Sequence, residues 1–166
     1  MNLNVYPNGM AAWNHQELRC ALGNGGISAT KQEGDGVTPA GVFSLRRVLY
    51  RPDRIEPPKS ILPVSALTAA DGWCDEPGHP KYNQQISTPF GGHHENLWRE
   101  DGLYDVIAIV GHNDDPIVSG AGSAIFLHVA KPDFSATEGC VAFSRTGLLK
   151  ILDQWNESSL LDIRTE

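Results

Sequence analysis

Apolar residues along the chain occur in short runs that are bounded by turn residues, a pattern typical of β-strands. The 17 glycines and 11 prolines interrupt the sequence often and favour short strands over long helices. Strands are expected in five segments that are rich in Val, Ile, Leu and Phe: Leu18–Leu22, Gly41–Tyr50, Val106–Val110, Ala124–Ala130 and Cys140–Phe143.

One helix is predicted near the end of the sequence. Ser144 is suited to cap its N-terminus, and apolar residues then recur at helical spacing, at Leu148, Ile151, Leu152 and Trp155. Residues 160–163 are expected to form a last edge strand. With 166 residues and no linker or internal repeat, the chain is interpreted as one mainly β domain, residues 1–166.

The segment from about residue 51 to residue 99 predicts little regular structure. It contains seven prolines and the sequence Gly91-Gly92-His93-His94. Loops of this length inside a domain are usually functional or disordered. Because the segment also holds aromatic residues that favour burial, we expect an ordered loop region near a site; these are Trp73, Tyr82, Phe90 and Trp98.

The charge balance restricts the class of partner. The formal net charge is -7, with 13 basic and 20 acidic side chains, which argues against a nucleic-acid groove or an anionic membrane surface. No apolar stretch of about 18 residues occurs, so no membrane span is expected. Residues 1–13 have neither a basic nor an apolar region typical of a secretory signal. A cytoplasmic location, a missing export signal and another export route all stay open.

Three cysteines, Cys20, Cys74 and Cys140, show no metal-binding spacing. Buried free thiols are the simplest interpretation of Cys20 and Cys74, although their pairing stays open. Cys140 differs because an apolar run ends at His128, twelve positions before it, and a polar loop then leads to Thr137-Glu138-Gly139-Cys140.

The chemistry of Cys140 would depend on a neighbouring base. A thiol needs a base or a positive charge to become the nucleophilic thiolate, and His128 can supply one if the two strands are neighbours. Gly139 permits a sharp turn, and the N–H groups of Gly139 and Cys140 could face an oxyanion, where each donor is worth about 3 kcal/mol. A histidine and a cysteine that merely pack in a core remain the alternative.

The segment resembles the catalytic core of the L,D-transpeptidases, the YkuD domain family. Their signature is a His near a strand end, a loop, and then Ser or Thr, His, Gly and Cys, which His128, Thr137, Gly139 and Cys140 match. Upstream, residues 31–41 (KQEGDGVTPAG) resemble the segment that precedes a strand in this family. Three further pieces resemble a proteobacterial branch of it: Asp71–Asp75, Tyr82-Asn83 and Leu97–Arg99.

Two residues depart from the family pattern. Glu138 stands where the second His is usual, and Ala142 stands where Arg or Asn is often found. These departures leave the nucleophile and base in place and concern the acyl-donor pocket. They resemble the branch that joins L-alanine to meso-diaminopimelate, rather than the relatives that join two diaminopimelates.

The resemblance implies a β-sandwich with one or two flanking helices and transfer of peptidoglycan stem peptides through a Cys140 thioester. No cofactor or metal is implied, and the substrate points to the periplasm. Trp98 and Arg99 fit a lid that holds a stem carboxylate, because an Arg fork matches a carboxylate. A buried Trp98 and an ion-paired Arg99 are the alternative. Other candidate substrate-binding residues are Tyr82, His112, Thr137, Glu138 and Arg145, while His94 and Glu95 fit either substrate binding or a loop surface.

Three other functions stay open at this point. A metal hydrolase would use His79, His93, His94 or His112, but no H-E-x-x-H or C-x-x-C pair occurs. A non-catalytic peptidoglycan-binding module would need neither His128 nor Cys140. A hydrolase with the same dyad would let water resolve the thioester. The sequence does not indicate an oligomeric state.

Overall fold

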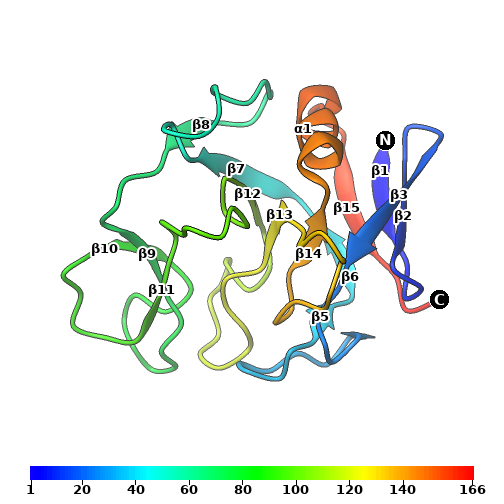
Figure 1. Ribbon diagram of the computed structural model, residues 1–166. Helices are drawn as coiled ribbons and strands as arrows, with labels where there is room; N and C mark the ends of the chain where they lie inside the picture. Colours follow the sequence, from blue (N-terminus) through cyan, green and yellow to red (C-terminus); the bar gives the residue numbers. More distant parts are fainter.

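The computed structural model describes residues 1–166 and consists mainly of one large curled sheet, with a helix and a small three-stranded sheet beside it (Figure 1). The large sheet has ten strands in the order β6-β15-β1-β2-β3-β14-β13-β12-β7-β8. Their bounds are β1 Asn2–Val5, β2 Met10–Trp13, β3 Gln16–Ala21, β6 Gly41–Phe43, β7 Leu45–Tyr50, β8 Val64–Ala66, β12 Val106–Val110, β13 Phe126–Val129, β14 Val141–Phe143 and β15 Leu160–Ile163.

The large sheet curls because one continuous segment, residues 41–50, contributes strands near both ends of the strand order. Only Ser44 separates β6 from β7, yet β6 is the first strand of the sheet and β7 is next to the last. The larger core, of 20 buried residues, contains side chains from both halves of the curled sheet, including Leu3 and Val48. The sheet thus forms the two layers of a sandwich around its own core.

The helix α1 (Arg145–Gln154) begins as expected, because Ser144 Oγ accepts a hydrogen bond from the N–H of Gly147 at 3.1 Å. Its apolar residues Leu148, Ile151 and Leu152 are fully buried in the larger core. After the helix, Trp155 stacks on Trp13 of β2 with ring centroids 5.3 Å apart. The helix and the residue after it therefore cover the larger core.

A small sheet in the order β10-β9-β11 lies beside the large one, with bounds Gln85–Ser87, Asp71–Cys74 and His94–Asn96 (Figure 1). A two-stranded sheet joins β4 (Ile27–Ser28) to β5 (Thr38–Pro39). The small sheet packs on the large one through a second core of ten buried residues, among them Trp73, Leu97 and Phe126. We call residues 51–105, which contain this small sheet, the insertion.

Strands β12, β13 and β14 separate the two cores. Alternation along each strand sends Leu127 and Val141 into the larger core, and Phe126 and Cys140 into the second core. His128 lies two residues after Phe126 and shares its face. The sheet therefore presents both residues of the expected dyad to the side covered by the insertion.

The mainly β prediction is confirmed, as are the helix, its cap and the strand Val106–Val110. Residues 160–163 form a strand, but the prediction of an edge strand is wrong, because β15 pairs with β1 on one side and β6 on the other. The segment 51–99 holds four short strands, β8 to β11, which its prolines and glycines did not indicate. All three cysteines are free and buried.

The helix α1 has ten residues, and the structure contains no helix that is long and apolar enough to span a membrane.

Candidate active site

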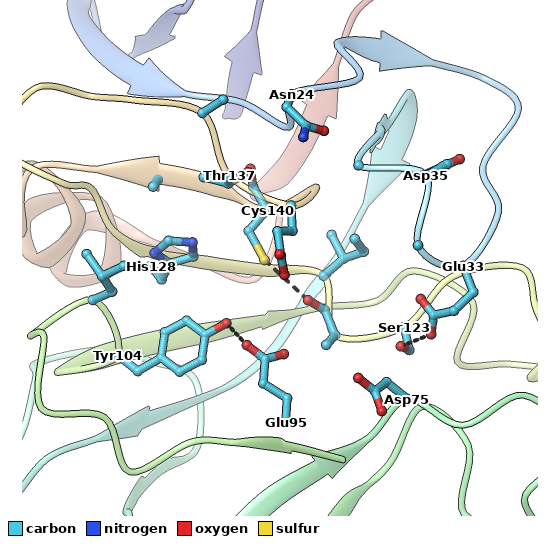
Figure 2. Close-up of a pocket in the computed structure, with 18 of the residues that line it drawn as sticks. Asn24, Glu33, Asp35, Asp75, Glu95, Tyr104, Ser123, His128, Thr137 and Cys140 are labelled. Carbon is cyan, nitrogen blue, oxygen red and sulfur yellow. Dashed lines mark hydrogen bonds between the residues drawn. The ribbon is translucent and has the colours of Figure 1, made fainter. Parts of the chain in front are cut away.

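A cavity of about 640 Å³ lies between the large sheet and the insertion, and Figure 2 shows its lining. The large sheet and its loops contribute His128, Cys140 and Ala142, together with the charged side chains of Lys31, Glu33, Asp35, Lys131 and Glu138. The insertion contributes mainly charged groups, which are Asp75, His93, Glu95 and Arg99, together with Leu103 and Tyr104. The expected nucleophile and base, which come from the large sheet, thus face charged side chains of the insertion.

Cys140 lies immediately before β14, and only 8% of the residue is exposed. Its Sγ donates to the carbonyl oxygen of Ala124 at 3.2 Å and accepts from the N–H of Phe126 at 3.4 Å. Burial and, to a smaller extent, the carboxylate of Glu95 raise the pKa of the Cys140 thiol to about 12. The sulfur is therefore held as a thiol.

His128 lies on β13, which runs parallel to β14 with His128 opposite Ala142. Its Nδ1 lies 2.9 Å from the carbonyl oxygen of Val129, which can only accept, so Nδ1 carries the proton and Nε2 keeps a lone pair. Burial lowers the pKa of His128 to about 4. The ring packs edge-on against Tyr104, with centroids 5.3 Å apart. A neutral imidazole with a free lone pair is suited to accept a proton.

The turn before Cys140 is fixed by Thr137. Its Oγ1 donates to the carbonyl oxygen of Cys140 at 2.7 Å and accepts from the N–H of Gly139 at 3.2 Å. The Gly139 N–H, which we expected to face an oxyanion, is thus engaged within the turn. The N–H of Cys140 makes no hydrogen bond and is the donor left beside the sulfur.

Only glycine fits at position 139. Its φ of +135° is one that other residues rarely adopt, and a Cβ there would lie 2.8 Å from the carbonyl oxygen of Val37. The turn can therefore pack against the loop before β5, and this close approach sets the position of Cys140.

The insertion brings Glu95 of β11 toward the sulfur (Figure 2). The Tyr104 hydroxyl donates to Glu95 Oε1, and the nearest cation, Arg99 Nη1, lies 4.0 Å from the same oxygen. Burial raises the pKa of Glu95 to about 6. Sequence reasoning left Glu95 undecided, and only the pairing of β11 with β9 places it in the cavity.

The loop that carries Ala124 is held by Tyr82 and Asn83. The Tyr82 hydroxyl accepts from the N–H of Gly122 at 3.1 Å. Asn83 Oδ1 accepts from Trp73 Nε1 at 2.9 Å and from the N–H of Ala124 at 3.1 Å. Tyr82 therefore lies behind the cavity wall and supports the segment whose carbonyl holds the Cys140 thiol.

Of the residues that we selected from the sequence, five line the cavity together: His128, Cys140, Thr137, Glu138 and Arg99. Arg99 is ion-paired, because its Nε and Nη2 contact Asp101 at 3.1 and 2.5 Å. Glu138 is exposed at the rim and has no hydrogen-bond partner.

Besides Tyr82 and Gly139, three selected residues lie outside the cavity lining. His112 packs edge-on against Phe43, and its Nδ1 is buried without a hydrogen-bond partner. Trp98 lies under the guanidinium of Arg51, 3.6 Å from ring centroid to Cζ. Arg145 pairs with the buried Asp105.

No group of three or more His, Cys, Asp or Glu side chains is arranged to hold a metal ion. In a comparison with protein families, the model described as YkuD, L,D-transpeptidase catalytic domain, matches residues 2–163. No curated protein and no solved structure matched the chain.

Proposed function

Because the chain belongs to the L,D-transpeptidase catalytic-domain family, whose substrate is peptidoglycan, we propose that it crosslinks stem peptides through a thioester on Cys140. In this proposal residues 1–166 form one catalytic domain, with Cys140 as nucleophile and His128 as its base. Peptidoglycan lies outside the cytoplasmic membrane, so the proposed site of action is the periplasm.

The observation that carries the proposal is the arrangement of the dyad: His128 lies on β13, and Cys140 lies immediately before the parallel neighbour β14. Cys140 and His128 share one face of the sheet and one cavity, and the Val129 carbonyl orients His128 with its Nε2 lone pair free. A cysteine and a histidine that only fill a core have no need of a fixed tautomer or an open cavity.

Acylation starts from a neutral thiol and a neutral imidazole, because burial opposes both charges. As Sγ attacks a stem-peptide carbonyl, its proton passes to His128 Nε2. The Cys140 N–H is available to stabilise the oxyanion, in place of the pair of donors that we expected from the sequence. The tetrahedral intermediate then breaks its C–N bond, and the leaving amine takes the proton from His128.

The thioester is resolved by an amine of a second stem peptide. We propose the L-alanine to meso-diaminopimelate linkage, because Glu138 and Ala142 replace the residues usual in relatives that join two diaminopimelates. Ala142 lines the cavity and is fully buried, so no cation reaches the donor pocket from this position. An exposed carboxylate at Glu138 also disfavours a donor with an anionic group at that rim.

The test is to incubate the protein with purified disaccharide-peptides and to analyse the products by mass spectrometry. The parent protein should form a crosslinked dimer that the Cys140→Ala variant does not form. Cys20→Ala is the matched control, because Cys20 is an equally buried free thiol in the other core and should leave the yield unchanged.

Fragmentation of the dimer would identify the linkage. Trimmed monomers without dimers would indicate a hydrolase with the same dyad. Equal turnover by Cys140→Ala would refute the proposed nucleophile, and no product from any protein would favour a peptidoglycan-binding module.

A further inference from the structure

We propose that Glu95 binds the ammonium group of the acyl acceptor and so directs the thioester toward an amine rather than water. This inference rests on the proposed function, and it assigns to the insertion the recognition of the second substrate. The large sheet would supply the chemistry, and β11 would supply the selectivity.

The position of Glu95 is the first argument. Figure 2 shows its carboxyl group pointing from β11 into the cavity, on the side where Cys140 and Tyr104 also lie. Its charge reaches the sulfur, because the Glu95 carboxylate contributes to the raised pKa of Cys140. An acceptor amine must approach the carbonyl that is bonded to this sulfur, so an ammonium on its way there passes the carboxylate.

The second argument is that Glu95 lacks a close cation. Its one hydrogen bond comes from the neutral Tyr104 hydroxyl, and Arg99 stays 4.0 Å away while its Nε and Nη2 bind Asp101. Only 27% of the Glu95 side chain is exposed, so water compensates the charge poorly. Burial accordingly raises the pKa of Glu95 to about 6.

Two other carboxylates of the cavity have cationic partners, whereas Glu33 and Glu138 do not. Asp35 pairs with Lys31 at 2.5 Å, and Asp75 pairs with His93 at 2.5 Å. Glu33 accepts from the Ser123 hydroxyl, on the side of the cavity away from Tyr104 in Figure 2. Glu95 is therefore the half-buried carboxylate beside Cys140 and Tyr104 that lacks a close cation, because Glu138 is exposed to water and Glu33 lies on the other side of the cavity (Figure 2).

A carboxylate at this position fits the chemistry of the second half-reaction. The acceptor arrives as an ammonium ion with three protons on nitrogen. One proton must leave before the nitrogen can attack, because only the neutral amine has a lone pair. As the amide C–N bond then forms and the thioester C–S bond breaks, one proton stays on the amide and one goes to the sulfur of Cys140. Glu95 first binds the ammonium and can then take the released proton, because its pKa lies near neutrality.

The experiment separates the two half-reactions. The thioester on Cys140 is first formed from donor alone and followed by intact-protein mass. A diaminopimelate-containing disaccharide-tripeptide is then added as charged acceptor, and hydroxylamine, which is uncharged at neutral pH, serves as the comparison nucleophile. Both nucleophiles are added to the preformed thioester, because loss of the Glu95 charge also acts on the pKa of Cys140 and so on acylation. In Glu95→Gln we expect an unchanged rate constant for hydroxylamine, but at least an about tenfold lower rate constant for the charged acceptor.

Two further variants keep the test decisive. Tyr104→Phe removes only the hydroxyl that holds Glu95. It should lower the rate constant for the charged acceptor but not that for hydroxylamine, and by a smaller factor than Glu95→Gln. Glu56→Gln makes the same charge change on an exposed side chain without partners and should match the parent. If Glu95→Gln slows both nucleophiles equally, or neither, the inference is refuted while the thioester mechanism stands. If the parent forms no thioester, the proposed function itself is refuted, and this inference with it.

Discussion

Replacing Asn83 with Ala removes the group that joins the insertion to the loop beside the nucleophile. Asn83 is 6% exposed, and its side chain makes four hydrogen bonds. Its Oδ1 accepts from Trp73 and Ala124, and its Nδ2 donates to the carbonyl oxygens of His112 and Asn113 at 3.1 and 2.8 Å. The truncation therefore leaves two donors and two acceptors without partners.

The expected loss of unfolding free energy follows from these contacts. Each buried group left unsatisfied costs about 1 kcal/mol at the lower end of the usual range. Ala at the φ of +54° found at position 83 adds about 1 kcal/mol, because it lacks the short polar side chain that lets Asn tolerate left-handed backbone. We expect a loss of about 4–5 kcal/mol, which is a large part of the 5–15 kcal/mol typical of a folded domain.

The assay is urea unfolding followed by tryptophan fluorescence, with Asn113→Ala as the matched control. Asn113 has nearly the same φ, +50°, and also bonds the loop, but it is half-buried, so water can replace its lost contacts. Its loss should be about 1–2 kcal/mol. A loss for Asn83→Ala below about 2 kcal/mol, or equal to that of Asn113→Ala, would refute the reasoning. Thioester formation should slow as well, because Ala124 would no longer be held beside the sulfur.

Other predictions concern the dyad and its surroundings. His128→Asn should lower the rate of thioester formation by about 10²–10⁴-fold with the fold retained, measured by intact-protein mass and circular dichroism; a smaller loss would exclude His128 as base. Gly139→Ala should prevent both activity and the native thermal transition, because its Cβ would lie 2.8 Å from the Val37 oxygen. Alkylation of Cys140 by iodoacetamide should keep rising from pH 7 to pH 10, because its pKa is about 12; a plateau near pH 6 would indicate an ion-paired thiolate instead. Glu95→Gln should stabilise the protein by about 1 kcal/mol at pH 7.5 but not below pH 4.5, because a folded-state pKa raised to about 6 makes the ionised carboxylate destabilising as pH rises; an equal effect at both pH values would contradict this.

The sequence predicts best what depends on neighbouring residues. The strand Val106–Val110 is uniformly apolar, and the helix after Ser144 combines a cap with helical spacing, so both follow from local pattern. The position of β15 does not, because its pairing with β6 depends on contacts across the whole chain. The strands of the insertion have three or four residues, too few to show a period.

The site divides in the same way. Cys140 and His128 stand out because their loop resembles a family signature. The sequence also indicated that the two residues meet if their strands are neighbours, which the pairing of β13 with β14 makes them. Glu95 and Asn83 lie where the insertion packs on the sheet. Their roles could not be predicted, because the spacing of residues in the sequence does not indicate how these two parts pack together. Trp98 and Arg145 show the converse: residue types suited to binding a ligand are used to fix Arg51 and Asp105.

The place of β15 between β1 and β6 has a consequence for synthesis. A nascent chain that has not yet released residues 160–163 from the ribosome leaves the facing edges of β1 and β6 unpaired, since β15 bonds to both. The curled sheet then cannot close, although nearly all of its strands have been made. Closure of the sheet therefore waits until β15, which follows the other nine strands in chain order, has emerged, and until then the open edges are available to chaperones or to wrong partners.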